Sequence, residues 1–136
     1  MEATIEYLGN VKFEVSARGH RVVCDQPPEN KGTDEGMTPP EFLLASLGTC
    51  AGYYAAEYLR ARALAAEGLK VRITAEKVLK PARLDSFRIE VTVPAGLGSQ
   101  HEEGVMRAVK LCLIHNTLLN SPKVETVIRT QVETPV

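Results

Sequence analysis

The chain has 136 residues, of which 44% are hydrophobic and 24% charged, the usage of a folded domain rather than a disordered chain. Its 16 basic and 17 acidic residues give a net charge of −1. Nucleic acid and anionic membranes are therefore not expected as partners, because binding to them depends on excess positive charge. The length predicts a single domain over residues 1–136, with about two-thirds of its unfolded surface buried.

The cysteine pattern and the N-terminus predict a cytoplasmic protein with reduced thiols. Residues 1–4 lack the basic start and apolar core of a secretory signal. Cys24, Cys50 and Cys112 are odd in number and form no CxxC pair, so they do not define a disulfide framework. The three histidines form no HxH or HExxH pair, and the glycines form no phosphate-binding motif, so we expect neither a metal site nor a cofactor.

The N-terminal part of the chain is predicted to form three short strands followed by a loop. Residues 3–8, 11–15 and 21–25 carry apolar side chains in the alternating pattern of strands and are separated by turn residues. Residues 26–37 are rich in proline, glycine and charge, which predicts a loop of about a dozen residues. Loops of that length in compact domains usually serve a purpose.

The clearest helix start is at Thr38, a candidate N-cap with Glu41 three residues on, as in a capping box. Pro39 suits the first helical position. Residues 42–56 carry no charged side chain, so this helix should lie inside an assembly. If Gly68 caps its C-terminus, the helix has about 28 residues and a length of about 42 Å. A subunit of this size cannot bury such a helix, so we expect a kink or a partner subunit.

The C-terminal half is predicted to contain two strands, a helical stretch and a last strand. Residues 69–79 and 87–93 alternate, and residues 124–132 resemble a final strand. A second capping box at residues 99–102 opens a helical stretch that continues to residue 119. One stripe of this stretch holds Val105, Val109, Cys112 and Leu113. This grouping predicts an α+β fold with an antiparallel-rich sheet rather than alternating βαβ units.

Cys50 lies in the middle of the uncharged helix, between Gly48 and Gly52. These glycines share one helix face and let another backbone approach closely. A glycine inside a helix costs about 1 kcal/mol relative to alanine, so a packing or functional reason is expected. A buried free cysteine is often only a small core residue. Alternatively, Cys50 is a nucleophile in a tight pocket, and it then needs a nearby cation to hold it as a thiolate.

The remaining candidates are ambiguous by sequence alone. Cys112 is either a core residue or a thiol that attacks an oxidised Cys50 to form a disulfide, and nothing in the spacing places the two within reach. We interpret Cys24 as structural. His115 is one helical turn from Cys112, but a hydrogen-bonded histidine is a simpler interpretation than a Cys–His pair. Glu41 lies about 180° from Cys50 around the helix axis, and its capping role accounts for it.

Two segments resemble a known family. Residues 34–50, DEGMTPPEFLLASLGTC, are similar to the G-x-TPPE-x-L-L-A-x-L-G-x-C signature of the OsmC-like superfamily, in its TPPE-type branch. Residues 112–118, CLIHNTL, resemble the second cysteine segment of that family, C-x-[IV]-x-N-x-L. The resemblance implies an OsmC-like α+β fold, in which an antiparallel-rich sheet wraps long central helices. It also implies an intertwined homodimer with active sites at the interface.

The resemblance further implies a cysteine-based peroxidase that reduces organic hydroperoxides or hydrogen peroxide in oxidative-stress defence, without metal or cofactor. Cys50 would be the peroxidatic cysteine and Cys112 the resolving one, and a dithiol reductant would restore the pair. An arginine from the N-terminal strands stabilises the thiolate in such peroxidases. Arg18 matches that position best, and Arg21 is the alternative.

One position departs from the family's peroxidases. There, a carboxylate ten residues before the first cysteine pairs with the arginine, whereas here Pro40 holds that place. Glu41 follows one residue later, rotated by about 100° around the helix, and is the candidate carboxylate of the site. Two further hypotheses stay open: a non-enzymatic protein that binds a small molecule or senses redox state, and thioester or acyl chemistry at Cys50.

Overall fold

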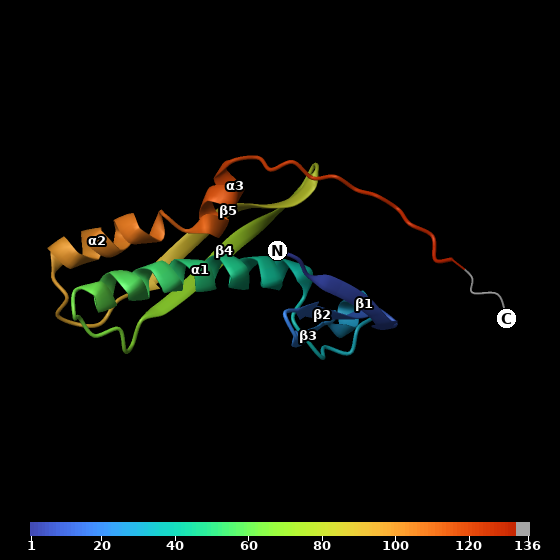
Figure 1. Cartoon of the computed structure of the whole chain (residues 1–136), viewed down its shortest axis with the longest axis horizontal. Helices are drawn as coiled ribbons and strands as arrows, with labels where there is room; N and C mark the ends of the chain where they lie inside the picture. Colours follow the sequence, from blue (N-terminus) through green and yellow to red (C-terminus); the bar gives the residue numbers. More distant parts are fainter. Residues whose placement is uncertain (133–136) are drawn as a thin grey trace.

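The computed structural model describes residues 1–132, which form an α+β arrangement (Figure 1). The elements in chain order are β1 (Thr4–Gly9), β2 (Lys12–Ala17), β3 (His20–Cys24), the short 3-10 helix η1 (Pro28–Asn30), α1 (Pro39–Ala61), β4 (Lys70–Leu79), β5 (Ala82–Thr92), α2 (Ser99–Val109) and α3 (Leu113–Leu119). The predicted α+β class and the antiparallel pairing are confirmed. The strands form two separate sheets, β1–β2–β3 and β4–β5.

The loop between β3 and α1 is organised by the buried carboxylate of Asp25, which is 1% exposed. It accepts hydrogen bonds from the backbone N–H groups of Gln26 at 2.8 Å and Glu35 at 3.0 Å, and from the Thr33 hydroxyl at 3.1 Å. The Glu35 and Gln26 bonds hold the pKa of Asp25 below its usual value despite burial. The predicted loop is therefore an ordered structure that leads into α1.

Helix α1 starts as predicted and ends earlier than predicted. Thr38 is its N-cap and forms the capping box with Glu41. The helix ends at Ala61, because the Leu64 N–H bonds to the Leu59 carbonyl at 2.9 Å while Ala63 adopts a left-handed φ of 55°. This Schellman-type end is usually made by glycine, so the sequence placed the end wrongly at Gly68. The helix has 23 residues rather than about 28.

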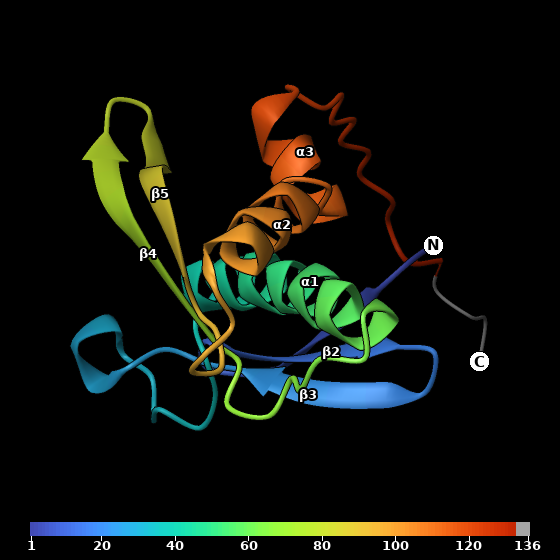
Figure 2. The ribbon, with the colours of Figure 1, turned by 90° about the vertical axis from the view of Figure 1, so that its left-hand side faces the viewer.

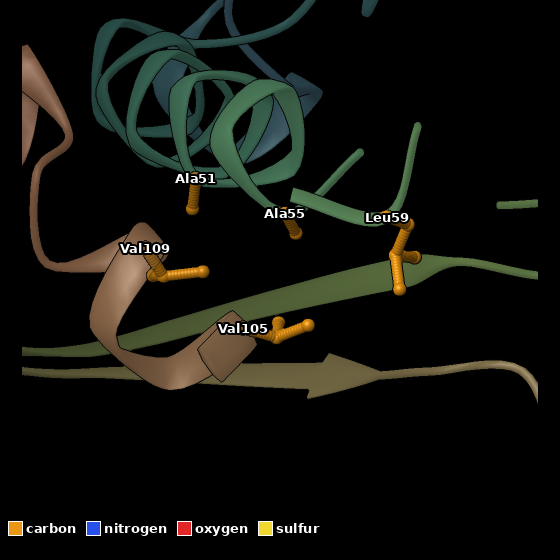
Figure 3. Packing of buried hydrophobic residues seen from close by; sticks show 5 residues of the cluster. All are labelled: Ala51, Ala55, Leu59, Val105 and Val109. Carbon is orange, nitrogen blue, oxygen red and sulfur yellow. The ribbon is translucent and has the colours of Figure 1, made fainter. Parts of the chain in front are cut away.

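The core lies between α1, α2 and the β4–β5 hairpin. Ala51, Ala55 and Leu59 on α1 point toward Val105 and Val109 on α2, and all five are buried (Figure 3). Spacing of four residues places the α1 members on one face. The two helices approach closely enough that a Cβ on Gly104 would lie 2.0 Å from the Tyr58 hydroxyl oxygen.

The two glycines that flank Cys50 contact the hairpin. A Cβ on Gly48 would lie 3.0 Å from Cγ1 of Ile73, and one on Gly52 would lie 3.6 Å from Cγ2 of Val71. The predicted packing reason for these glycines is thus confirmed, with the side chains of β4, rather than a backbone, as the neighbours. This face of α1 is committed to the hairpin, so Cys50 lies on another face.

The second helical stretch is interrupted where the sequence predicted continuity. Gly98, not Ser99, is the N-cap of α2, so the second capping box is wrong. Helix α2 ends at Val109, and Cys112 is the N-cap of α3. Because the helix breaks, Leu113 leaves the predicted buried stripe and is 58% exposed, whereas Val105, Val109 and Cys112 are buried.

The strand predicted at residues 124–132 is not formed in the chain on its own. Residues 121–132 run without regular structure away from α3 (Figure 1). Val124, Ile128 and Val132 are 82%, 91% and 92% exposed. A strand needs a neighbouring edge to satisfy its backbone groups, and within residues 1–132 this segment pairs with none.

Candidate functional site

The structure brings two of the sequence-predicted site residues together. Cys50 lies in the middle of α1, and Cys112 stands directly before α3, which packs against α1. The Cys50 side chain neighbours the Cys112 thiol and contributes to raising the pKa of Cys112, and both cysteines are free thiols. Two neighbouring free thiols are candidates for a disulfide.

The two thiols have different surroundings. Cys112 is fully buried, whereas Cys50 is half-buried. Burial, followed by the neighbouring Cys50, raises the pKa of the Cys112 thiol, and the backbone N–H groups of His115 and Ile114 lower it in part. The His115 N–H donates to the Cys112 sulfur at 3.4 Å. A buried, protonated Cys112 is a poor first nucleophile, so Cys50 is the sulfur that a reagent from solvent reaches first.

The predicted arginines do not meet Cys50 within the chain. Arg18 is exposed in the turn between β2 and β3, with a left-handed φ of 50°. Arg21 lies on β3 and its guanidinium is 3.9 Å from the Glu14 carboxylate. The N-terminal sheet lies beyond the N-terminal end of α1 (Figure 1), and in residues 1–132 neither arginine contacts the cysteine pair.

Glu41 occupies the capping position in the first turn of α1. Its Oε1 accepts hydrogen bonds from the Thr38 backbone N–H at 3.0 Å and from the Thr38 hydroxyl at 2.8 Å. These bonds, the backbone one first, lower the pKa of the Glu41 carboxyl, which is therefore ionised at neutral pH. Both bonds use the same oxygen, and within the described part of the chain Oε2 has no hydrogen-bond partner.

The other cysteine and the histidines give no sign of a metal centre. Cys24 is buried at the end of β3, and burial, then the Asp25 charge, raises its pKa, which fits the structural role predicted for it. In residues 1–132, no group of three His, Cys, Asp or Glu side chains is arranged to hold a metal ion. None of the helices there has the length and hydropathy of a membrane span.

Two features of the region, one residue and one helix break, had not been predicted from the sequence. Asp25 closes the loop before α1, and its signal was weak because one aspartate before a proline-rich loop is unremarkable in composition. The helix break that brings Cys112 to the start of α3 had no signal either, because cysteine is not among the usual N-cap residues. Because the break could not be predicted from the sequence, the orientation of Cys112 toward α1 could not be predicted either.

The fold and the paired thiols define a class of α+β proteins with a two-cysteine site. The family model for OsmC-like proteins matches residues 32–127, a span that contains both cysteines. The chain therefore belongs to the OsmC-like protein family. No curated protein matches the sequence.

Several solved structures share the fold at low sequence identity. A protein from Psychrobacter arcticus 273-4, described as a putative osmotic stress induced and detoxification response protein, has a TM-score of 0.78 at 18% identity, with 85% of each chain covered. An OsmC-like protein from Mycoplasma pneumoniae has a TM-score of 0.76 at 18% identity, covering 88% of this chain and 87% of its own. An organic hydroperoxide resistance protein from Elizabethkingia anophelis gives 0.66 at 14% identity, with 88% and 87% covered. These likenesses establish the fold.

Proposed function

We propose that this protein is a thiol-dependent peroxidase that reduces hydroperoxides in an oxidative-stress response. The observation that carries the proposal is the meeting of two free thiols, one accessible and one buried, from separate elements of the chain. Membership of the OsmC-like family supports it. So do fold relatives described as organic hydroperoxide resistance and as osmotic stress and detoxification proteins.

The reaction follows from the different positions of the two sulfurs. The Cys50 thiolate attacks the terminal peroxide oxygen, a sulfur–oxygen bond forms and the O–O bond breaks, so that Cys50 becomes a sulfenic acid and the leaving alkoxide takes a proton from solvent to become the alcohol. The Cys112 thiol then attacks the resulting sulfenic acid. A disulfide forms, and the hydroxyl of Cys50 leaves with the Cys112 proton as water. An external dithiol becomes oxidised to a disulfide as it restores both thiols.

The same chemistry requires a cation beside Cys50, and we assign it to Arg18 of a second copy of the chain. The N-terminal sheet exposes Ile5 by 56% and Tyr7 by 65%, and α1 exposes Tyr53 by 61%. Monomeric proteins rarely leave such faces and an unpaired arm at residues 121–132 uncovered. An intertwined homodimer would cover them, and it would carry Arg18 from one subunit to the Cys50 of the other.

Glu41 is assigned to hold that arginine. Its free Oε2 and its ionised carboxylate at the start of α1 provide a partner for a guanidinium from a second subunit. This placement serves the same purpose as the earlier carboxylate of the family's peroxidases. The Oε1 atom keeps its capping bonds with Thr38, so capping and pairing are compatible.

The test is consumption of cumene hydroperoxide in the presence of dithiothreitol. Cys50→Ser should abolish turnover, because no sulfur remains to attack the peroxide. Arg18→Met should lower kcat/KM by about 100-fold if the thiolate loses its cation. Arg21→Met is the matched control on the neighbouring strand and should change it little. Wild-type protein that consumes neither cumene hydroperoxide nor hydrogen peroxide would exclude the proposal.

A second candidate is a redox-sensing or small-molecule-binding protein with little turnover. One observation favours it: within residues 1–132, no arginine is hydrogen-bonded to Cys50, and the guanidinium of Arg21 faces Glu14 instead. Such a protein would still form the Cys50–Cys112 disulfide when oxidised, but dithiothreitol would reduce that disulfide too slowly to support continuous peroxide consumption. The ratio of peroxide consumed to protein present separates the two, because a sensor stops near one.

A further inference from the structure

A cleft of about 480 Å³ lies between β5 and α2, apart from the N-terminal sheet and the arm. Figure 2 shows the β4–β5 hairpin beside α2, with β5 as the strand nearer to α2. Phe87, Ile89 and Val91 of β5, with Val93 directly after the strand, line one wall. Val105, Met106 and Val109 of α2 line the other. Its volume is in the range of small-molecule sites, and its walls are mainly apolar.

Two charged groups of opposite sign lie at the two ends of this cleft. Glu102 stands in the first turn of α2 and Lys110 directly after its last residue, and both line the cleft. Eight helical residues separate them by roughly 12 Å along the axis. An anion is therefore repelled at the Glu102 end and attracted at the Lys110 end, which fixes one orientation for an amphipathic ligand.

His115 adds a third polar group to the cleft lining, and one of its ring nitrogens has an unusual environment. Its Nδ1 is buried, and within residues 1–132 it has no hydrogen-bond partner. An unpartnered lone pair is tolerated more readily than an unpartnered N–H, which favours the tautomer with the proton on Nε2. In that tautomer the histidine is a hydrogen-bond donor, as is the Lys110 ammonium. Two donors with one positive charge match a carboxylate.

We propose that the cleft between β5 and α2 binds an amphipathic monocarboxylate. Its head group contacts Lys110 and the His115 Nε2–H, and its apolar chain lies between β5 and Met106. A chain of about eight to ten carbons matches the roughly 12 Å between the two polar ends. The site is independent of the proposed peroxidase activity, because neither Cys50 nor Cys112 lines the cleft.

Calorimetric titration of the reduced full-length protein tests this site with three probes of equal chain length, below their micelle concentrations. Decanoate should bind, decanol should bind at least tenfold more weakly, and decylammonium should bind weakest. Lys110→Met should weaken decanoate about tenfold, the effect of one charge-assisted contact, and leave decanol unchanged. Arg107→Met is the matched control, because Arg107 lies on α2 but does not line the cleft.

A further variant tests whether decanoate binds in the cleft itself. Met106→Glu places a carboxylate in the wall at a side chain that is 60% exposed, so the fold should tolerate it, and decanoate binding should be lost. The proposal is overturned if decanoate does not bind at about 1 mM. It is also overturned if decanol binds as tightly as decanoate, or if Lys110→Met and Arg107→Met weaken the binding of decanoate equally. Cys50→Ser should bind decanoate as wild type does, which keeps this outcome distinct from the peroxidase test.

Discussion

The body formed by α1, α2 and the β4–β5 hairpin differs from the N-terminal sheet and the C-terminal arm in how apolar side chains are used. In the body, Leu59, Val105 and Val109 are at most 4% exposed. In the sheet and arm, Tyr7 is 65% and Ile128 is 91% exposed. The body buries its apolar side chains within a single chain. The sheet and the arm have the alternating pattern of buried strands, but their apolar side chains are exposed. Cys50 belongs to the body and Cys112 lies directly after it, at the start of α3, whereas the proposed arginine belongs to the N-terminal sheet.

The largest expected effect concerns the arm. Residues 124, 126, 128, 130 and 132 are all β-branched, the pattern of one strand face. If this face pairs with a second subunit, Ile128→Glu should convert a dimer into a monomer, as measured by light scattering with size-exclusion chromatography. Gln131→Glu, on the opposite face of the arm, should leave the dimer intact. A wild-type protein that is monomeric at micromolar concentration would contradict the proposed assembly.

Next in size is the effect of a cavity in the body. Leu59 is fully buried between α1, α2 and the hairpin, so Leu59→Ala should lower the free energy of unfolding by about 2–5 kcal/mol. Leu79→Ala, at a site that is 83% exposed, should change it by less than about 0.5 kcal/mol. Urea denaturation measures both. Equal effects of the two variants would mean that the body is not packed around Leu59.

The contact between α1 and α2 gives a smaller effect. Gly104→Ala forces a methyl group against the Tyr58 ring, whose hydroxyl also bonds to Nδ1 of His101 at 3.1 Å and whose face carries the Arg62 guanidinium at 3.6 Å. Because the ring is held on two sides, we expect a loss of about 1–3 kcal/mol. Gly52→Ala meets only an ordinary contact with Val71 and should gain up to about 1 kcal/mol in helix propensity. Thermal unfolding that ranks Gly104→Ala above wild type would contradict this packing.

The smallest effect is the acid sensitivity of the loop before α1. The pKa of Asp25 is lowered in the folded protein, so its stabilisation is complete above its unfolded pKa near about 3.9 and is lost as pH falls through the lower folded value. The Tm of wild type should therefore fall more between about pH 5 and pH 3 than the Tm of Asp25→Asn. At neutral pH, Asp25→Asn should be lower in Tm by about 5 °C. Parallel pH profiles for the two proteins would show that Asp25 does not organise the loop.

Local signals predicted much of this molecule. The three N-terminal strands, the capping box of α1 and the small-residue face at Gly48 and Gly52 all follow from periodicity or cap chemistry within a few residues. The errors came from effects without a local signal. Ala63 takes a left-handed conformation that glycine usually takes, and residues 124–132 have the pattern of a strand but no pairing edge within residues 1–132.

The candidate site shows the same division. Each cysteine stood out by its motif, but their proximity depends on α3 packing on α1 after the break at Cys112, a tertiary effect that spacing does not encode. Arg18 was chosen by resemblance, and its distance from Cys50 within one chain could not be foreseen. A residue contributed by a second subunit has no sequence relation to the site it serves.

The sulfur pair is tested most directly by the intact mass of the reduced protein after one equivalent of cumene hydroperoxide. We expect the wild-type mass to fall by two hydrogen atoms, with a Cys50–Cys112 cross-link in the peptide map. The mass of Cys112→Ser should rise by one or more oxygen atoms on Cys50, and the mass of Cys50→Ser should not change. Wild-type protein whose mass stays unchanged, or whose cross-link involves Cys24, would contradict the claim that Cys50 and Cys112 form one reactive unit.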